Sequence, residues 1–268
     1  LRRLFRGFAG KAEAVVLNLD DDETRLLAAA LPPERLVTCG FRDESADLFG
    51  SGLVEAPFAV TFEASDRRTG ATVPVALRLP GLHNAQNALA AIAAALEIGV
   101  SLADAAAALA GFAGLRRRLE RVGSAGGVTV IDDFAHNPDK IAATLRTLHA
   151  FPGRLLLFFQ PHGYGPLRTM KDALIGAFAR EMAAEDVLIM PDPVYYGGTT
   201  SREVGSGDIV EGVAALGRTA EHVAERAAAG ERLLALARPG DRLVVMGARD
   251  DTLGEFATGL LARLGGGS

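Results

Sequence analysis

Five polar side chains that could bind a ligand follow two apolar runs of the chain. The first run leads into Asp132, Asp133 and His136, and the second leads into Gln160 and His162. Each run is typical of a buried strand of a parallel sheet, and parallel strands bring their carboxyl ends to one edge, where open α/β sheets bind ligands. A carboxylate there can accept two hydroxyl hydrogen bonds from a ribose, and an imidazole can orient it or contact phosphate. We therefore expect a ligand site at this edge.

The loop residues of this region have structural explanations that compete with ligand binding. His162 could guide an amine or a carboxylate substrate, but a loop histidine bonded to backbone explains it equally well. Arg168 and Arg249 could bind a carboxylate or form surface salt bridges. Residue types and spacing leave these alternatives open.

Three consecutive arginines, Arg116 to Arg118, lie between Gly114 and a strand-like segment that includes Glu120. Guanidinium groups offer paired donors to phosphate oxygens, so the run could clamp a phosphorylated ligand. On charge alone, a solvated strand edge is an equally good explanation.

The start of an alanine-rich helix, expected from residue 83 to about residue 98, carries His83, Asn84 and Asn87. Asn84 and Asn87 are three residues apart, so they lie on nearly the same face of the helix. Their amides could hydrogen-bond a nucleobase, although spacing alone favours helix capping.

A similar choice applies to the acidic run Asp20 to Asp22, which follows an expected strand. Adjacent carboxylates can suggest a metal site, but three aspartates at the start of a helix are ordinary capping chemistry. We favour capping, and we expect no metal site in this chain.

The elements around these residues predict an α/β protein with two domains. Residues 111–268 alternate strands and helices, among them a helix over 169–182, and this alternation indicates a Rossmann-like domain with a mainly parallel sheet. In residues 1–110, alternating segments over 58–64 and 72–79 predict an antiparallel hairpin. We place the boundary between the domains near Gly111.

Composition excludes several classes of protein. The chain has 268 residues, of which 49% are hydrophobic, and this is enough for packed globular domains. A net charge of −5, without a broad basic cluster, argues against a nucleic-acid partner. No stretch supplies the roughly 20 apolar residues of a membrane span. The one cysteine, Cys39, cannot form an internal disulfide, which is compatible with a reducing, cytoplasmic location.

Common catalytic motifs are missing from these 268 residues. The sequence contains no zinc-type spacing of His and Cys, no Gly-x-Ser-x-Gly and no Gly-x-x-x-x-Gly-Lys-[Ser/Thr]. Any nucleotide chemistry would therefore take place without a phosphate-cradling loop from this stretch of sequence.

Four strings, taken in order along the chain, resemble motifs of the Mur ligases, the ATP-dependent amino-acid ligases of peptidoglycan synthesis. The strings are Gly81-Leu82-His83-Asn84 with Asn87-Ala88, Phe112-x-Gly114 with Arg117-Arg118 and Glu120, Asp132-Asp133-Phe134-Ala135-His136-x-Pro138, and Phe159-Gln160-Pro161-His162. Each string is a weak signal by itself, whereas the four in the family's order are a strong one. They are similar to the branch that adds L-alanine or a murein peptide to UDP-N-acetylmuramate.

The resemblance implies fold, chemistry and residue roles. ATP would phosphorylate the muramyl carboxylate, and an amine would attack the acyl phosphate to form an amide, with Mg²⁺ as a second cofactor. By resemblance, the nucleotide would be bound by His83, Asn84, Asn87, Asp133 and His136. Catalysis would involve Arg117, Arg118 and His162, and the amino-acid substrate would meet His162, Arg168 and Arg249.

The resemblance covers only the later part of the family's plan. The UDP-binding domain, the glycine-rich ATP loop and the Mg²⁺ ligands would all precede Leu1. Residues 1–110 would then be the trailing part of a P-loop-type ATPase domain. We expect an incomplete portion of a ligase that is inactive by itself.

Departures from the family's motifs leave the added amino acid open. Gly163 stands where the alanine-adding branch has an arginine after Pro-His, so Arg168 or Arg249 would supply the carboxylate clamp. One alternative is a non-catalytic module that binds an amino acid, a peptide or a nucleotide with a partner chain, and an exposed apolar sheet edge would favour a fragment or an obligate partner. A dinucleotide-using enzyme is weaker, because no Gly-x-Gly-x-x-Gly follows a strand.

Overall fold

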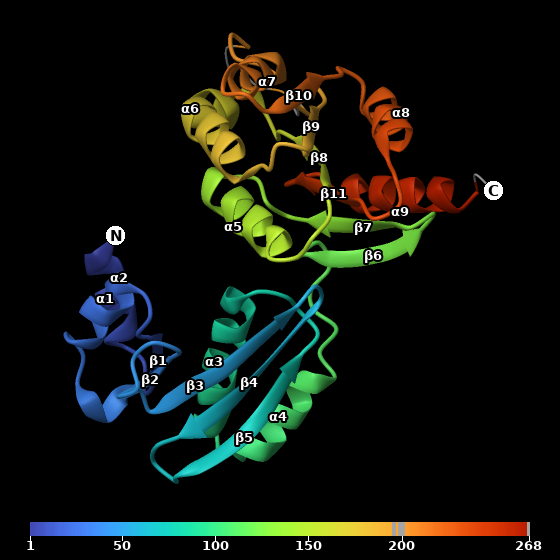
Figure 1. The fold of residues 1–268 in the computed structure, drawn as a ribbon. Coiled ribbons are helices and arrows are strands. Elements are labelled where there is room, and N and C mark those ends of the chain that lie inside the picture. Colours follow the sequence, from blue (N-terminus) through green and yellow to red (C-terminus); the bar gives the residue numbers. More distant parts are fainter. Residues whose placement is uncertain (195–196, 198–201, 267–268) are drawn as a thin grey trace. The chain divides into compact units, whose positions relative to one another are not determined.

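The computed structural model describes residues 1–194, 197 and 202–266. The chain divides into two compact units, which we call unit 1 (Leu1–Gly114) and unit 2 (Leu115–Ser268). Both are drawn in Figure 1. The division falls just after Gly111, where the sequence suggested a boundary.

Unit 1 is built on a mixed sheet in the strand order β1-β2-β3-β4-β5. The strands are β1 (Val15–Asn18), β2 (Leu36–Gly40), β3 (Leu48–Ala56), β4 (Ala59–Asp66) and β5 (Ala71–Leu77). β1, β2 and β3 are parallel neighbours, whereas β3, β4 and β5 are antiparallel. The hairpin expected near residues 58–79 is therefore confirmed as β4 and β5.

Strand β3 was not expected from the sequence, because it contains Gly50-Ser51-Gly52, which is typical of a loop. In the structure Leu48 and Phe49 pair with β2 on one side, and the strand pairs with β4 along its length on the other, with a register shift between Ser51 and Val54. Pairing on both sides outweighs the weak local preference of this segment for a strand.

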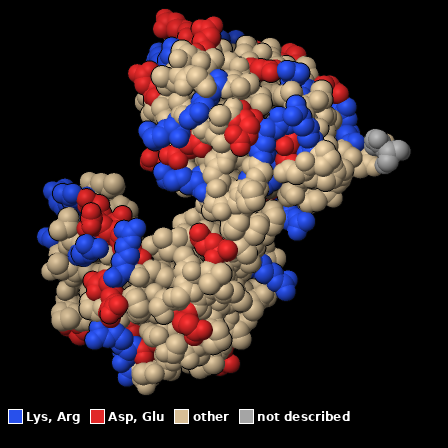
Figure 2. Space-filling model, in the orientation of Figure 1, with Lys and Arg blue, Asp and Glu red and all other residues tan. Residues whose placement is uncertain are grey.

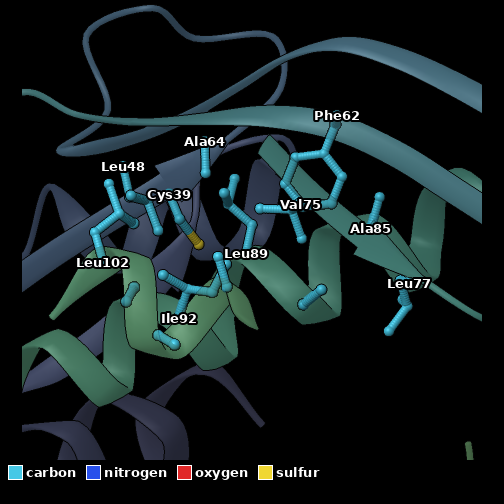
Figure 3. Close-up of a cluster of buried hydrophobic side chains, with 14 of the residues drawn as sticks. Cys39, Leu48, Phe62, Ala64, Val75, Leu77, Ala85, Leu89, Ile92 and Leu102 are labelled. Atoms are coloured by element: carbon cyan, nitrogen blue, oxygen red, sulfur yellow. The ribbon is translucent and has the colours of Figure 1, made fainter. Parts of the chain in front are cut away.

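Helices α1 (Arg2–Ala9), α2 (Asp22–Ala28), α3 (Leu82–Glu97) and α4 (Leu102–Ala110), with the 3₁₀ turn η1 (Pro33–Arg35), complete unit 1. The core lies between α3 and the sheet. Leu89 and Ile92 of α3 belong to one buried cluster with Leu48, Phe62 and Val75 of the strands (Figure 3). Burial of such side chains stabilises the fold by about 1.5–3 kcal/mol each.

Of the aspartates after β1, Asp21 has the predicted capping role, whereas Asp20 ties two other segments together. Asp21 is the N-cap of α2 and accepts from the backbone amides of Glu23 and Thr24 at 2.9 and 3.0 Å. Asp20 instead accepts from the amide of Phe41 at 2.9 Å and from Gln86 Nε2 at 2.8 Å, which links the loop to α3. Within the described ranges no group of His, Cys, Asp or Glu side chains could hold a metal ion.

Unit 2 is a Rossmann-like layered domain, and its mainly parallel sheet confirms the expected fold class. The strands lie in the order β10-β9-β8-β11-β7-β6, and only the pairing of β6 with β7 is antiparallel among those described. Their bounds are β6 (Glu120–Ala125), β7 (Val128–Asp133), β8 (Leu155–Gln160), β9 (Val187–Met190), β10 (Thr219–His222) and β11 (Arg242–Gly247).

Helices cover both faces of the unit 2 sheet. The helices α5 (Pro138–His149), α6 (Tyr164–Glu181) and α7 (Ser206–Ala215) pack side by side in that order, and α8 (Arg226–Leu236) and α9 (Thr252–Gly265) also contact each other (Figure 1). Val128 and Val130 of β7 join a buried cluster with Leu253 and Ala257 of α9. Since side chains alternate along a strand, Asp132 lies on the α9 face of the sheet and its neighbour lies on the α5 face.

Helix α6 begins at Tyr164, earlier than the expected start at residue 169. Pro166 suggested a loop, yet a proline is tolerated in the first turn of a helix because the amide it lacks has no partner there. The earlier start places the amino end of α6 directly after His162 and Gly163.

The surface carries both charges, and α1 presents a group of exposed apolar side chains. Figure 2 shows acidic and basic side chains interspersed over the visible face of each unit. Leu4, Phe5 and Phe8 of α1 are 69%, 56% and 76% exposed. Among the helices of the described residues, none combines the length and the apolar character needed to cross a membrane.

Candidate functional site

The carboxyl ends of β7, β11 and β8 form the edge that carries the candidate site. β11 lies between the other two, and Met246 pairs with Asp133 on one side while Gly247 pairs with Gln160 on the other. The chain leaves β7 and β8 into α5 and α6 on one face, and leaves β11 into α9 on the other. Strands whose connections leave on opposite faces create the crevice in which open α/β sheets bind ligands.

Arg117 is built into this edge. Its side chain is 9% exposed, and Nη1 and Nη2 each donate at 2.9 Å, to the carbonyl oxygens of Asp250 and Gly247. Its Nε lies 3.4 Å from Asp132 Oδ2. The sequence suggested that this guanidinium faces a phosphate, whereas the structure places its donors against backbone carbonyls.

Arg118 is exposed and has a different environment. Its guanidinium carbon lies 5.2 Å from the ring centroid of Phe134, a distance typical of a cation–π contact. An open hollow of about 500 Å³ adjoins it, lined by Arg116, Arg117, Arg118, Phe134 and Asp251. Its exposed donors and the positive lining suit an anionic ligand.

Asp133 turns inward, toward α5. The carboxylate is 6% exposed, and the hydroxyl of Thr144 donates to its Oδ2. Burial raises the pKa of Asp133, while hydrogen bonds from Thr144 and from the backbone amides of Leu119 and Phe134 act in the opposite direction. A ribose contact of Asp133 stays a prediction, and this geometry gives the residue a role in holding the loop.

Asp132 is 1% exposed and pairs with Arg117. Burial, opposed by the attraction of Arg117, raises the pKa of Asp132 to about 6. Its Oδ1 and the Oε1 of Gln160 are buried without a hydrogen-bond partner. Unpaired buried acceptors are uncommon in folded proteins and are often found at functional sites.

The structure brings together the two histidines that the sequence placed at separate strand ends. The rings of His136 and His162 pack edge to face with centroids 5.4 Å apart, and His136 Nδ1 lies 2.8 Å from the carbonyl oxygen of Phe134. Burial lowers the pKa of His162, and electrostatic interactions with His136 and Arg249 lower it further. The imidazole of His162 is therefore neutral at pH 7 and can accept a proton.

Arg168 and Arg249 are both exposed. Arg249 follows the end of β11 in a left-handed backbone conformation, with φ of +59°, and it is close enough to act on the charge of His162. Arg168 lies in the second turn of α6. Binding of a carboxylate by either residue stays a prediction.

The remaining candidates belong to unit 1. Asn84 donates through Nδ2 to the carbonyl oxygen of Pro80 at 2.7 Å, while Gly81 is the N-cap of α3. Asn84 is therefore not the N-cap of α3, and the capping role that spacing alone favoured for it is wrong. His83 and Asn87 are exposed in the first turns of the same helix, and nucleotide binding by these three residues stays a prediction.

Two contributors to the site were missed by the sequence interpretation. Phe134 lies beside the guanidinium groups of both Arg117 and Arg118, and Thr144 donates to Asp133 from the middle of α5. Phe134 directly follows Asp133 at the end of β7, and this position could have marked it. Thr144 carries no such signal, because only packing of α5 brings it to β7.

Comparison with known proteins agrees with this architecture. Residues 2–95 match the Mur ligase middle domain, and residues 117–249 match the Mur ligase glutamate ligase domain. A UDP-N-acetylmuramate–L-alanine ligase of Gluconacetobacter diazotrophicus is 35% identical over 234 residues, covering 82% of this chain and 46% of that protein. The chain thus spans less than half the length of this relative.

Two solved structures share the fold. The UDP-N-acetylmuramate–alanine ligase of Thermotoga maritima aligns with a TM-score of 0.70 at 23% identity, over 98% of this chain and 54% of that one. A murein peptide ligase of Psychrobacter arcticus aligns with a TM-score of 0.64 at 24% identity, over 99% and 54%. With both domain matches in the family's order, the chain belongs to the Mur ligase family.

Proposed function

We propose that the chain is part of an ATP-dependent ligase of peptidoglycan synthesis or recycling. The ligase would join L-alanine or a peptide to UDP-N-acetylmuramate through an acyl phosphate. The observation that supports this most is the arrangement at the edge of the unit 2 sheet. An exposed arginine borders an open hollow there, and Phe134 of the same lining packs against one of two histidines that contact each other. Membership of the Mur ligase family gives this arrangement its reaction class.

In this proposal Arg118, rather than Arg117, contacts the phosphates of ATP. The donors of Arg118 are exposed beside the hollow, whereas two nitrogens of Arg117 already donate to carbonyl oxygens. A guanidinium stabilises the negative charge that spreads over a transferring phosphoryl group. His136 and Asp133 would lie toward the ribose. Nucleotide binding by His83, Asn84 and Asn87 of unit 1 stays a separate prediction.

His162 would act on the attacking amine. Its neutral imidazole can accept the proton that the amine loses as its nitrogen attacks the carbonyl carbon and phosphate leaves. The exposed guanidinium groups of Arg168 and Arg249 would hold the carboxylate of the amino acid or peptide. This division of roles follows from protonation and exposure.

Mg²⁺ enters the proposal only as a family cofactor. When bound to ATP it neutralises phosphate charge, but the described residues offer no cluster of side chains that fits a metal site. We therefore assign no residue of this chain to the metal and derive no step through it. A cytoplasmic location belongs to the same proposal.

The alternative is a non-catalytic binding module that needs a partner chain. It is favoured by the exposed apolar side chains of α1. A partner that covers α1 would remove this apolar surface from water.

An assay of the natural protein, isolated at whatever length it has in its own cells, separates the two proposals. Phosphate release from ATP would be measured with UDP-N-acetylmuramate and with L-alanine, other amino acids or a murein tripeptide. Turnover that requires both substrates supports the ligase. Nucleotide or amino-acid binding without turnover, by a protein whose intact mass equals the 28.0 kDa of this chain, supports the module.

A further inference from the structure

The backbone on both sides of Arg118 has an unusual conformation. Arg117 and Leu119 have φ of +59° and +48°, in the left-handed region that residues other than glycine seldom adopt. Two such residues around one exposed arginine persist only where surrounding contacts hold them. We call residues 115–119 the arginine segment.

The contacts of Arg117 supply this restraint from three directions. Its guanidinium donates to the carbonyl oxygens of Gly247, the last residue of β11, and of Asp250. Its own carbonyl accepts from the amide of Phe134, just beyond β7, at 2.7 Å. Its amide donates to Glu120 Oε2 at 2.7 Å. One residue thus fastens the arginine segment to the ends of two strands.

Asp132 completes the arrangement. A guanidinium that is 9% exposed needs a compensating charge, and Asp132 Oδ2, 3.4 Å from Arg117 Nε, supplies it from the end of β7. On the other side of Arg118, Leu119 is 7% exposed and its amide hydrogen-bonds Asp133. The backbone of Arg118 is therefore held on both sides, while its own side chain stays exposed.

We propose that Arg117 and Asp132 are positioning residues, which hold the arginine segment so that Arg118 faces the open hollow beside Phe134. This inference rests on the proposed function, because it takes Arg118 as the phosphate ligand. It assigns to Arg117 a role in turnover without contact with substrate. It gives Asp132, which the sequence placed among possible ligand-binding side chains, a positioning role instead.

The test compares Arg117→Met, Arg117→Lys and Asp132→Asn in the natural protein, with Arg121→Met as the control. Arg121 is an exposed arginine of the neighbouring strand β6. Two kinds of measurement are made on each variant. Steady-state kinetics gives kcat and KM for ATP, and amide hydrogen exchange without ligand is followed at residues 115–119 and 134. Exchange reports the position of the segment independently of ligase activity.

We expect Arg117→Met to lower kcat by about 30-fold while KM for ATP changes by less than about 3-fold. A displaced Arg118 would lose its contact with the phosphoryl group mainly in the transition state. Exchange in the arginine segment should become about 10-fold faster or more. Arg117→Lys should recover little of the lost kcat and little of the lost exchange protection, because one ammonium group cannot bind two carbonyl oxygens and a carboxylate at once. Combining Arg117→Met with Asp132→Asn should add nearly nothing to the loss of kcat.

Unchanged exchange in a folded Arg117→Met protein would overturn the inference, as would a rise in KM for ATP at constant kcat. If Arg117→Met does not fold, Arg117→Lys and Asp132→Asn decide the question by the same two measurements. A wild-type protein without ligase turnover would refute the proposed function instead, and the exchange data would then still decide whether Arg117 and Asp132 hold the segment.

Discussion

Both edges of the unit 2 sheet bury aspartate and arginine side chains, but the two edges differ in how completely these side chains are hydrogen-bonded. At the amino edge Asp186 is 0% exposed and accepts from the amides of Leu155 and Ala183 and from His149 Nε2, each at 2.8 Å. Beside it, Arg242 donates to the carbonyl oxygens of Leu148, Phe151 and Gly153. This edge is a network of buried charges whose hydrogen bonds are nearly complete.

The carboxyl edge also buries an arginine and an aspartate, but it leaves more atoms unpaired. Arg117 Nε, Asp132 Oδ1 and Gln160 Oε1 have no hydrogen-bond partner there, against Arg242 Nε alone at the amino edge among the described residues. A completed network stabilises the fold, whereas open acceptors beside an exposed arginine are suited to a ligand. The comparison predicts that changes at the amino edge alter stability and changes at the carboxyl edge alter function.

Asp186→Ala should have the largest effect. It leaves one buried and one partly buried amide and a histidine without their acceptor, so the free energy of unfolding should fall by about 3–5 kcal/mol. Urea denaturation followed by circular dichroism measures this. Asp172→Ala, at an exposed position of α6, is the control and should change stability by less than about 0.5 kcal/mol. Equal losses in the two variants would contradict the contrast between the edges.

The pH dependence of stability should show how much the ionisation of buried Asp132 lowers the free energy of unfolding. Its pKa of about 6 lies above the usual value, so the native state keeps a proton that the unfolded chain releases near pH 4. The free energy of unfolding therefore falls as pH rises from 4 to 6, by about 3 kcal/mol for this group. The charges that act on Asp132 are Arg117, Glu120 and Asp133.

Asp132→Asn tests this contribution. The wild-type free energy of unfolding minus that of the variant should decrease between pH 4 and 6 and be level above pH 7. Urea denaturation of both proteins across this range measures the difference. Parallel curves would mean that Asp132 titrates as it does in water.

Arg118→Ala should lower turnover by about 100-fold, equivalent to about 2.7 kcal/mol, because the charge on the transferring phosphoryl group loses a donor. Stability should change by less than about 0.5 kcal/mol, since the side chain is exposed. Steady-state phosphate release by the natural protein measures the first quantity and urea denaturation the second. A stability loss without a change in turnover would assign Arg118 to the structure.

His162→Asn should have the smallest effect, a roughly 10-fold loss of kcat/KM for the amine substrate. In the wild type, kcat/KM should fall on acidification only below the usual histidine pKa, because the pKa of His162 is lowered. The variant should lack this acidic limb. His222→Asn, which removes a histidine paired with Asp192, is the control. A limb that persists in His162→Asn would exclude His162 as the proton acceptor.

Much of the fold followed from local patterns. The buried runs of β7 and β8 and the alternation of β4 and β5 were recognisable because strand periodicity is a local property. The start of α6 was misplaced, since Pro166 marks either a loop or a first helical turn and only packing distinguishes them. Strand β3 was missed because its stability comes from neighbours distant in sequence.

The sequence by itself determined which residues are candidates for the site, because the order of the motifs and the ends of the strands can be recognised from residue types and spacing. It placed Asp133, His136 and His162 at one edge of a sheet, and the structure brings the two histidines into contact. What tertiary structure decided is the state of each side chain. Arg117 and Arg118 are identical in type and adjacent in sequence, yet one is buried against carbonyl oxygens and the other is exposed. Burial and hydrogen bonding depend on segments far away in the chain, so no local pattern could distinguish them.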